Sequence, residues 1–109
     1  MKKLYRIKKN EEFAEILGKK HSLASASFVV YHEKRKEANA RVGISVSKKL
    51  GDAVERNLIN RQVSEMARAL IDFETYPEDL IIIVRKPYLE KAFSDNKNDL
   101  EIAIKKAII

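Results

Sequence analysis

The hydrophobic and polar positions between residues 41 and 70 change their period once, and this change predicts a strand followed by a helix. From 41 to 47 apolar residues alternate with polar or small ones, as in a strand with one buried face. Beyond this strand Asp52 is followed three residues later by Glu55, which matches a capping box, so we expect a helix from Ala53. The helical stripe expected to face a core consists of Ile59, Val63, Met66 and Leu70.

Two further helices are indicated, one near each end of the chain. Asn10 can cap a short helix over residues 11 to 17, and Gly18 then stops it. The last helix should begin at Ser94 or Asp95. Its buried stripe would consist of Leu100, Ala103, Ile104 and Ala107.

Two more strands complete the expected sheet. Residues 28 to 33 are apolar on both sides at their centre, and residues 80 to 84 form a continuous apolar run after a turn at 76 to 79. Because a charged loop over 33 to 40 leads directly into the strand at 41 to 47, we expect strands 28–33 and 41–47 to pair as an antiparallel hairpin. We expect the run at 80–84 to lie parallel to the strand at 41–47 and next to it, in a β-α-β unit.

These elements predict an α+β fold in one domain spanning residues 1–109, with helices packed on a central sheet. A chain of 109 residues is long enough to bury a core without crosslinks. The sequence contains no cysteine, which excludes disulfides and thiolate metal sites. No apolar run approaches the roughly 20 residues of a membrane span, and residues 1 to 6 lack the apolar core of a signal peptide. We therefore expect a cytoplasmic protein with no membrane partner.

The charge of the chain favours a polyanionic partner. The formal net charge is +6, and residues 1 to 20 carry seven cations against three acids, whereas residues 72 to 79 carry four acids and no cation. Such a division into a basic and an acidic end would orient a nucleic acid. Net charge alone would equally suit an acidic membrane surface or no specific partner.

The polar face of the central helix has two possible interpretations. Its residues are Asn57, Asn60, Arg61, Ser64 and Arg68. This face is either the solvated side of an ordinary amphipathic helix or a surface that donates hydrogen bonds to phosphates and base edges. Its content of Asn and Arg, and the Ser-Lys-Lys segment entering the positive end of the helix, favour the second interpretation.

Two aromatic side chains, Phe13 and Tyr31, also have two interpretations. Each is either part of a hydrophobic core or a platform on which an unpaired base stacks beside basic residues. The sequence shows no catalytic constellation of its own. His21 and His32 are not spaced as metal ligands and are expected to be surface residues, and Asp52 with Glu55 is better explained by helix capping than by a metal ion.

Five separated motifs resemble those of one known family. The motifs are Y-R-I-K-K-N-E-E-F at 5 to 13, F-V-V-Y at 28 to 31, R-V-G-I-S-V-S-K-K-L-G-D-A-V at 41 to 54, R-N-x-x-N-R at 56 to 61 and I-I-I-V-R-K-P at 81 to 87. In this order and without large gaps they are similar to the protein subunits of bacterial ribonuclease P, over nearly the whole chain. Several motifs in register are far more specific than any one of them.

The resemblance implies a ribonucleoprotein endonuclease that removes the 5′ leader of precursor tRNA. The chemistry would be Mg²⁺-dependent hydrolysis carried out by an RNA subunit, which would bind the Mg²⁺, so no catalytic or metal-binding side chain is expected in this chain. The expected partners are the ribonuclease P RNA and the leader, without a required protein partner. The family fold has the outline α-β-β-β-α-β-α with a left-handed β-α-β crossover, whereas the general rule predicts a right-handed one.

The family's functional residues can be assigned to positions of this sequence. The family's Arg-Asn helix motif falls on Arg56, Asn57 and Arg61, and its flanking basic residues fall on Lys48 and Lys49. The pattern of charge and the polar helix face add three more, so the expected RNA-contacting residues are Arg6, Lys48, Lys49, Arg56, Asn57, Asn60, Arg61 and Arg68. The expected leader-binding cleft consists of Phe13, Leu17, Tyr31, Ser45 and Ser47.

This chain departs from the family pattern mainly along the central helix. Leu58, Asn60 and Ser64 stand where further basic residues are usual, so fewer phosphate contacts are expected there. The alternative function is a general structured-RNA-binding or ribosome-associated module without a nuclease partner. A metal-dependent nuclease made of protein alone would need an acidic cluster that the sequence does not offer.

Overall fold

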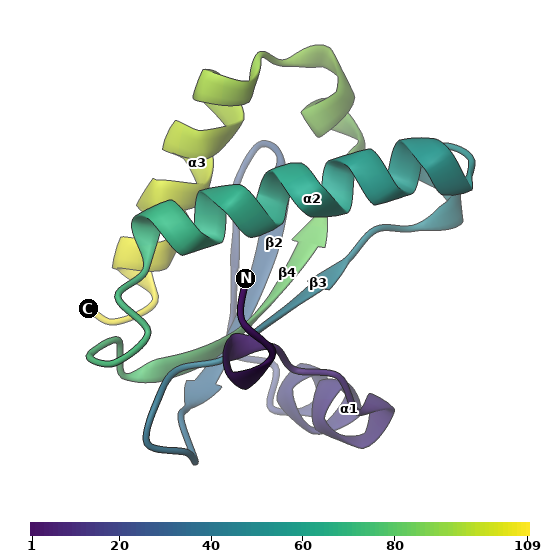
Figure 1. Ribbon diagram of the computed structural model, residues 1–109. Helices are drawn as coiled ribbons and strands as arrows, with labels where there is room; N and C mark the ends of the chain where they lie inside the picture. Colours follow the sequence, from purple (N-terminus) through teal and green to yellow (C-terminus); the bar gives the residue numbers. More distant parts are fainter.

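A computed structural model describes residues 1–109 as a four-stranded mixed sheet with three α-helices (Figure 1). The elements are α1 (Asn10–Gly18), β1 (Ser22–Ala24), β2 (Phe28–Lys34), β3 (Val42–Ser45), α2 (Ala53–Leu70), β4 (Glu78–Val84) and α3 (Phe93–Lys106). Short 3-10 turns lie at Lys3–Tyr5, Lys48–Leu50 and Lys86–Glu90. The α+β class and the outline α-β-β-β-α-β-α are confirmed.

The strand order in the sheet is β1-β2-β4-β3. The parallel pairing of β3 with β4 is confirmed. The hairpin expected between 28–33 and 41–47 is wrong, because β4 lies between β2 and β3 and pairs antiparallel with β2. The physical reason is that β4 is apolar on both faces, and such a strand is buried only at the centre of a sheet.

The β3-α2-β4 unit has the left-handed sense that the resemblance implies. In Figure 1, α2 lies in front of the sheet, both parallel strands run upward, and β4 lies to the left of β3. A right-handed crossover would place the second strand to the right in this view. The helix also crosses the strands obliquely instead of running back along them.

The helix boundaries agree with the sequence pattern to within one or two residues. α2 begins at Ala53 with the predicted capping box: the Glu55 N–H donates to Asp52 Oδ1 at 2.9 Å, and the Asp52 N–H donates to Glu55 Oε1 at 3.1 Å. Asn10 is the first residue of α1 and not its cap, and no side chain caps this helix. The last helix begins one residue early, at Phe93.

The strand boundaries differ from the sequence prediction more than the helix boundaries do. The short strand β1 has no apolar alternation, so only the family outline implied it and the hydrophobic pattern did not; it is defined by its pairing with β2. β3 ends at Ser45, because the Ser47 hydroxyl accepts a hydrogen bond from the Lys49 N–H at 3.2 Å and caps a 3-10 turn. The turn before β4 lies at residues 73 to 75 and not at 76 to 79, so Glu78 and Asp79 belong to the strand.

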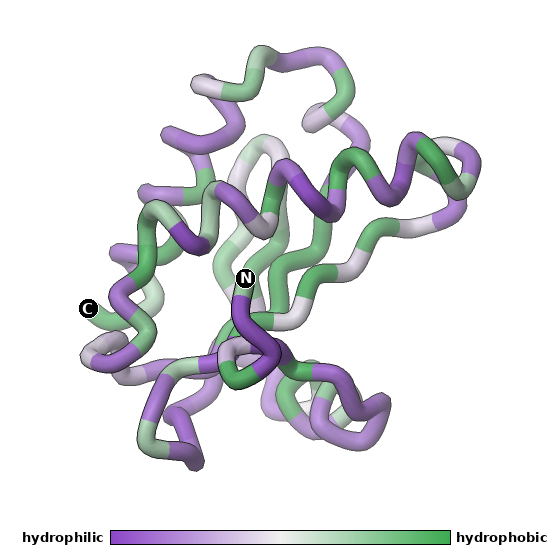
Figure 2. The backbone as a smooth tube through the Cα atoms, in the orientation of Figure 1, coloured by the Kyte–Doolittle hydropathy of each residue, from purple (hydrophilic) through white to green (hydrophobic).

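The main core lies between one face of the sheet and the helices α2 and α3. The largest fully buried side chains of this layer include Phe28, Val30, Leu80, Ile82 and Leu100. The predicted α2 stripe is buried at Ile59, Val63 and Met66 and partly buried at Leu70. In Figure 2 the strands are mostly hydrophobic, whereas the N-terminal segment and α1 are largely hydrophilic.

The opposite face of the sheet carries a small second cluster under α1. Its buried members are Ile7, Ile16 and Ile81. One face of the sheet is thus covered by two helices, and the other is covered only in part. In none of the helices is there an apolar stretch long enough to cross a bilayer.

Candidate nucleic-acid interface

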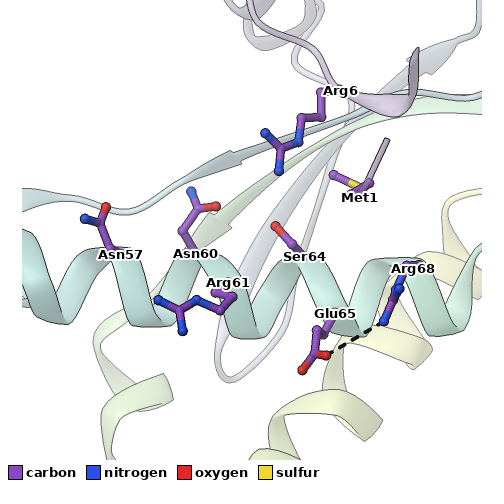
Figure 3. Close-up of a pocket in the computed structure, with 8 residues that line it drawn as sticks. All are labelled: Met1, Arg6, Asn57, Asn60, Arg61, Ser64, Glu65 and Arg68. Atoms are coloured by element: carbon purple, nitrogen blue, oxygen red, sulfur yellow. Dashed lines mark ion pairs between the residues drawn. The ribbon is translucent and has the colours of Figure 1, made fainter. Parts of the chain in front are cut away.

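A polar groove of about 510 Å³ runs between the N-terminal segment and the polar face of α2 (Figure 3). The residues lining it are Met1, Arg6, Asn57, Asn60, Arg61, Ser64, Glu65 and Arg68. Arg6 extends from the N-terminal segment toward the helix, from which Asn57 and Asn60 project on the same side. The groove therefore brings together five of the eight predicted RNA-contacting residues.

Three arginines give this groove an excess of positive charge. Its single acid, Glu65, lies 3.8 Å from the Arg68 guanidinium, but both side chains are about two-thirds exposed, so the pair is weak. Arg6 and Arg61 form no ion pair within the protein. Their guanidinium groups are thus free to form bidentate hydrogen bonds with phosphates.

The other three predicted RNA contacts lie outside the groove. Lys48 and Lys49 are exposed on the 3-10 turn that precedes α2. Arg56 is partly buried, and its Nε has no hydrogen-bond partner. The predicted set is therefore divided between the groove and the N-terminal end of α2.

The departures along α2 do not all face the groove. Asn60 and Ser64 line it, although Ser64 is only 9% exposed. Leu58 lines a separate hollow on another side of α2, with Tyr88 and Leu89. A cation at position 58 would not contribute to the groove.

The sheet face under α1 consists of two rows of side chains that follow from the strand register. One row crosses the sheet as Ser22, Tyr31, Ile81 and Gly43, and the next as Ala24, Val29, Ile83 and Ser45. α1 covers the first row with Phe13, Ile16 and Leu17. The second row remains more open: Ala24 and Ser45 are exposed, and Val29 and Ile83 are half-buried.

The predicted cleft residues lie along this face. Phe13, Leu17 and Tyr31 are half-buried and pack against the small cluster, so each aromatic side chain combines a packing role with partial exposure. Ser45 is exposed on the same face, whereas Ser47 lies beyond the strand, with its hydroxyl engaged in the cap. The sequence thus predicted four of the five positions on this face.

Phe13 connects the two surfaces. It lines a second hollow of about 180 Å³ beside Ile7, Gly43 and Ile44. Four residues, Met1, Arg6, Asn60 and Ser64, line both this hollow and the polar groove. A strand of nucleic acid can therefore pass from the arginines to the aromatic ring without leaving the protein surface.

The Phe13 ring lies directly on Gly43. A Cβ added to this glycine would lie 2.5 Å from Phe13 Cζ, closer than any side chain tolerates. We expect Gly43→Val to destabilise the protein by about 1 to 3 kcal/mol, because the ring must leave its place. Urea denaturation measures this change.

The matched control for this substitution is Gly18→Val. Gly18 ends α1, and a Cβ there would meet nothing within 4 Å. The free energy of unfolding of the Gly18→Val variant should stay within about 0.5 kcal/mol of the wild-type value, since valine and glycine differ little in helix propensity. Equal effects of the two substitutions would show that the contact of Phe13 with Gly43 does not constrain α1.

An ion-pair network beside the cleft was missed by the sequence interpretation. Arg41 pairs with Glu12 of α1 at 2.6 Å and with Asp79 of β4 at 3.2 Å. Burial raises the pKa of the Asp79 carboxyl, and the Arg41 guanidinium acts in the opposite direction. Two signals for this network were available in the sequence. Arg41 lies on the same side of its strand as Gly43, and Asp79 directly precedes the apolar run at 80–84.

Only one of the two histidines lies fully on the surface, where both were predicted. His21 is exposed, but His32 is half-buried, and its Nδ1 lies 2.8 Å from Glu78 Oε1. No group of three or more His, Cys, Asp or Glu side chains is arranged to hold a metal ion.

The fold and the two adjoining surfaces define a small basic α+β protein of the nucleic-acid-binding class. The family model described as Ribonuclease P matches residues 1–108. The ribonuclease P protein component of Exiguobacterium sp. is 44% identical over 107 residues, which cover 98% of this chain and 93% of that protein. The chain belongs to the ribonuclease P protein family.

Solved structures of relatives agree with this membership. The RNase P protein of Staphylococcus aureus is 42% identical and superposes with a TM-score of 0.83 over 94% of each chain. The RNase P protein of Thermotoga maritima is 28% identical, with a TM-score of 0.79 over 93% of this chain and 96% of that one. The fold is therefore shared along nearly the whole length of both relatives.

Proposed function

We propose that this protein is the protein subunit of ribonuclease P and assists endonucleolytic removal of the 5′ leader from precursor tRNA. It binds the catalytic RNA subunit with the polar groove and holds the leader against the face under α1. Hydrolysis is carried out by the RNA subunit, with Mg²⁺ bound mainly by that RNA, in the cytoplasm. The family membership supports this proposal.

One observation carries the proposal further than family membership. The arginine groove and the hollow beside Phe13 share four lining residues, so a phosphate-binding surface continues into an aromatic one. Structured RNA is bound mainly through its phosphates, whereas single strands are held by stacking on aromatic rings. A subunit that must hold both a folded RNA and a single-stranded leader needs these two surfaces side by side.

The RNA-contacting residues have distinct roles in this proposal. Arg6, Arg61 and Arg68 neutralise phosphates in the groove, and Asn57 and Asn60 donate directional hydrogen bonds between them. Lys48, Lys49 and Arg56 extend the contact toward the N-terminal end of α2. Because these three lie outside the groove, they would contact a neighbouring part of the RNA.

The leader-binding residues are fewer than the resemblance implies. Phe13 and Tyr31 offer partly exposed aromatic rings, Leu17 an apolar contact, and Ser45 a free hydroxyl on an open part of the sheet. Ser47 has its hydroxyl occupied by the Lys49 N–H and would contribute little. Because stacking does not distinguish strongly among bases, we expect weak sequence preference in the leader.

The decisive test is cleavage of a precursor tRNA at low Mg²⁺ by a bacterial ribonuclease P RNA, with and without the protein. We expect the protein to restore cleavage at the mature 5′ end, because its cations supply charge neutralisation that Mg²⁺ otherwise provides. The protein without the RNA should leave the substrate intact, and the cleavage site is mapped at nucleotide resolution.

The opposite outcome favours the alternative function. If the RNA cleaves equally with and without the protein, while the protein binds unrelated structured RNAs with similar affinity, a general RNA-binding module explains the groove better. Cleavage by the protein alone would contradict both assignments.

A further inference from the structure

Helix α1 has little intrinsic stability for an element that carries a binding residue. It spans nine residues, shorter than helices that are stable alone in water, and no side chain caps its N-terminus. It rests on a cluster of three buried residues that is separate from the main core. The position of Phe13 therefore depends on whatever else attaches α1 to the sheet.

Three ion pairs attach α1 to the rest of the protein, and they are unequal. Glu15 pairs with Lys36, and Lys19 lies 3.9 Å from Glu33, but both lysine side chains are about half exposed (49% and 54%). In the pair of Glu12 with Arg41 the exposed fractions are 27% and 12%, and the distance is 2.6 Å. Exposed pairs contribute little because water screens them, so the Glu12–Arg41 pair is the principal ionic attachment.

Arg41 is itself held by the centre of the sheet. Its backbone N–H donates to Asp79 Oδ1 at 2.9 Å, and its guanidinium donates to Asp79 Oδ2 at 3.2 Å. Asp79 lies in the central strand β4 and is 1% exposed. The guanidinium is therefore presented to α1 in a fixed place, as a planar bidentate group allows.

The pair acts together with the contact of Phe13 on Gly43. Glu12 and Phe13 are consecutive in α1, whereas Arg41 and Gly43 are two positions apart in the chain and lie on the same side. Two neighbouring contacts define both where the helix lies along the strand and how it is rotated. The buried Ile16, one turn further along α1, packs on Ile81 beside them.

We propose that Glu12 and Arg41 are positioning residues for the leader: their ion pair holds Phe13 on Gly43 and so sets the position of the partly exposed ring on which the leader stacks. The part of this inference that concerns the leader rests on the proposed function. The part that concerns the place of Phe13 depends on the geometry alone. The two parts are tested by separate measurements on the same variants.

The variant that tests the pair is Glu12→Gln, which keeps the shape and one acceptor oxygen but removes the charge. The matched control is Glu11→Gln. Glu11 is the other acidic residue in the first turn of α1 and forms no ion pair, so its substitution reproduces the loss of a favourable helix-dipole charge alone.

The first measurement is the NMR signal of the Gly43 α-protons, which lie against the Phe13 ring. The chain contains only three glycines, so glycine labelling gives a readily assigned spectrum. In Glu12→Gln we expect the ring-current shift of Gly43 to decrease toward the random-coil value, while the signal of Gly51, outside this cluster, stays in place. In Glu11→Gln both signals should remain at their wild-type positions.

The second measurement is the affinity of the protein–RNA complex for precursor and for mature tRNA. Glu12→Gln should weaken precursor binding by about 3- to 10-fold, part of the contribution of a stacked base, and leave mature tRNA binding unchanged. An unchanged Gly43 signal in Glu12→Gln overturns the positioning role. A changed signal with undiminished preference for precursor tRNA overturns the link to the leader. If the wild type itself shows no such preference, the proposed function has failed, and the Gly43 signal still decides the role of the ion pair.

Discussion

The combined substitution Arg6→Gln, Arg61→Gln and Arg68→Gln is expected to weaken binding to the ribonuclease P RNA by about 100-fold near physiological salt. Each phosphate contact contributes about 0.7 to 0.9 to the slope of log affinity against log salt, so three lost contacts should lower the slope by about 2 to 3. The three side chains lie on the groove, and two of them have no partner within the protein. Affinity measured over a series of salt concentrations gives both quantities.

A variant with the same net charge controls for this result. Lys91→Gln, Lys105→Gln and Lys106→Gln remove three exposed cations at and before α3, outside the groove. This control should keep most of the affinity and of the salt slope, because distant exposed charges are screened. If both triple variants lose affinity equally, overall charge and not the groove binds the RNA.

Phe13→Leu is expected to weaken precursor tRNA binding by the contribution of one stacked base, about 1 to 3 kcal/mol, and to leave mature tRNA binding nearly unchanged. Leucine keeps an apolar side chain against Ile7, Ile16 and Ile81, so α1 stays docked while the aromatic face is lost. The measurement compares the affinities of the protein–RNA complex for precursor tRNA with a leader and for mature tRNA.

Phe93→Leu is the control for a general effect of losing an aromatic ring. Phe93 is 43% exposed at the start of α3, away from the face under α1. It lines a hollow with Arg68, so Phe93→Leu should change the two affinities equally or not at all. Equal weakening of precursor and mature tRNA binding by Phe13→Leu would remove Phe13 from the leader cleft and leave it as a packing residue only.

Local signals in the sequence predicted the parts of the fold that depend on near neighbours. The capping box at Asp52 and the apolar stripe of α2 depend on residues three or four positions apart, and both are confirmed. The pairing partner of β2 depends on which strand occupies the centre of the sheet, a non-local choice. The continuous apolar run of β4 contained that information, but the short charged loop after β2 suggested a hairpin instead.

The residues of the candidate site also divide into those that local spacing predicts and those that depend on tertiary contacts. Helical spacing alone places Asn57, Asn60, Arg61 and Arg68 on one face, whereas Arg6 was known only as one cation of the basic N-terminal segment and reaches the groove by tertiary packing. Arg41 was missed because its partners Glu12 and Asp79 lie 29 and 38 positions away in the chain. Periodicity shows that a charged residue lies on a strand face, but not what that residue meets.

The central place of β4 also constrains how the protein is made. β2 and β3 have no direct contact in the sheet and are joined only through β4, which comes after α2 in the chain. During synthesis from the N-terminus, the first two-thirds of the polypeptide can form helices and the β1–β2 ribbon, but the sheet cannot close until Val84 has left the ribosome. The polar face of α2, with Arg61 and Arg68, therefore emerges before the strand that completes the sheet supporting it.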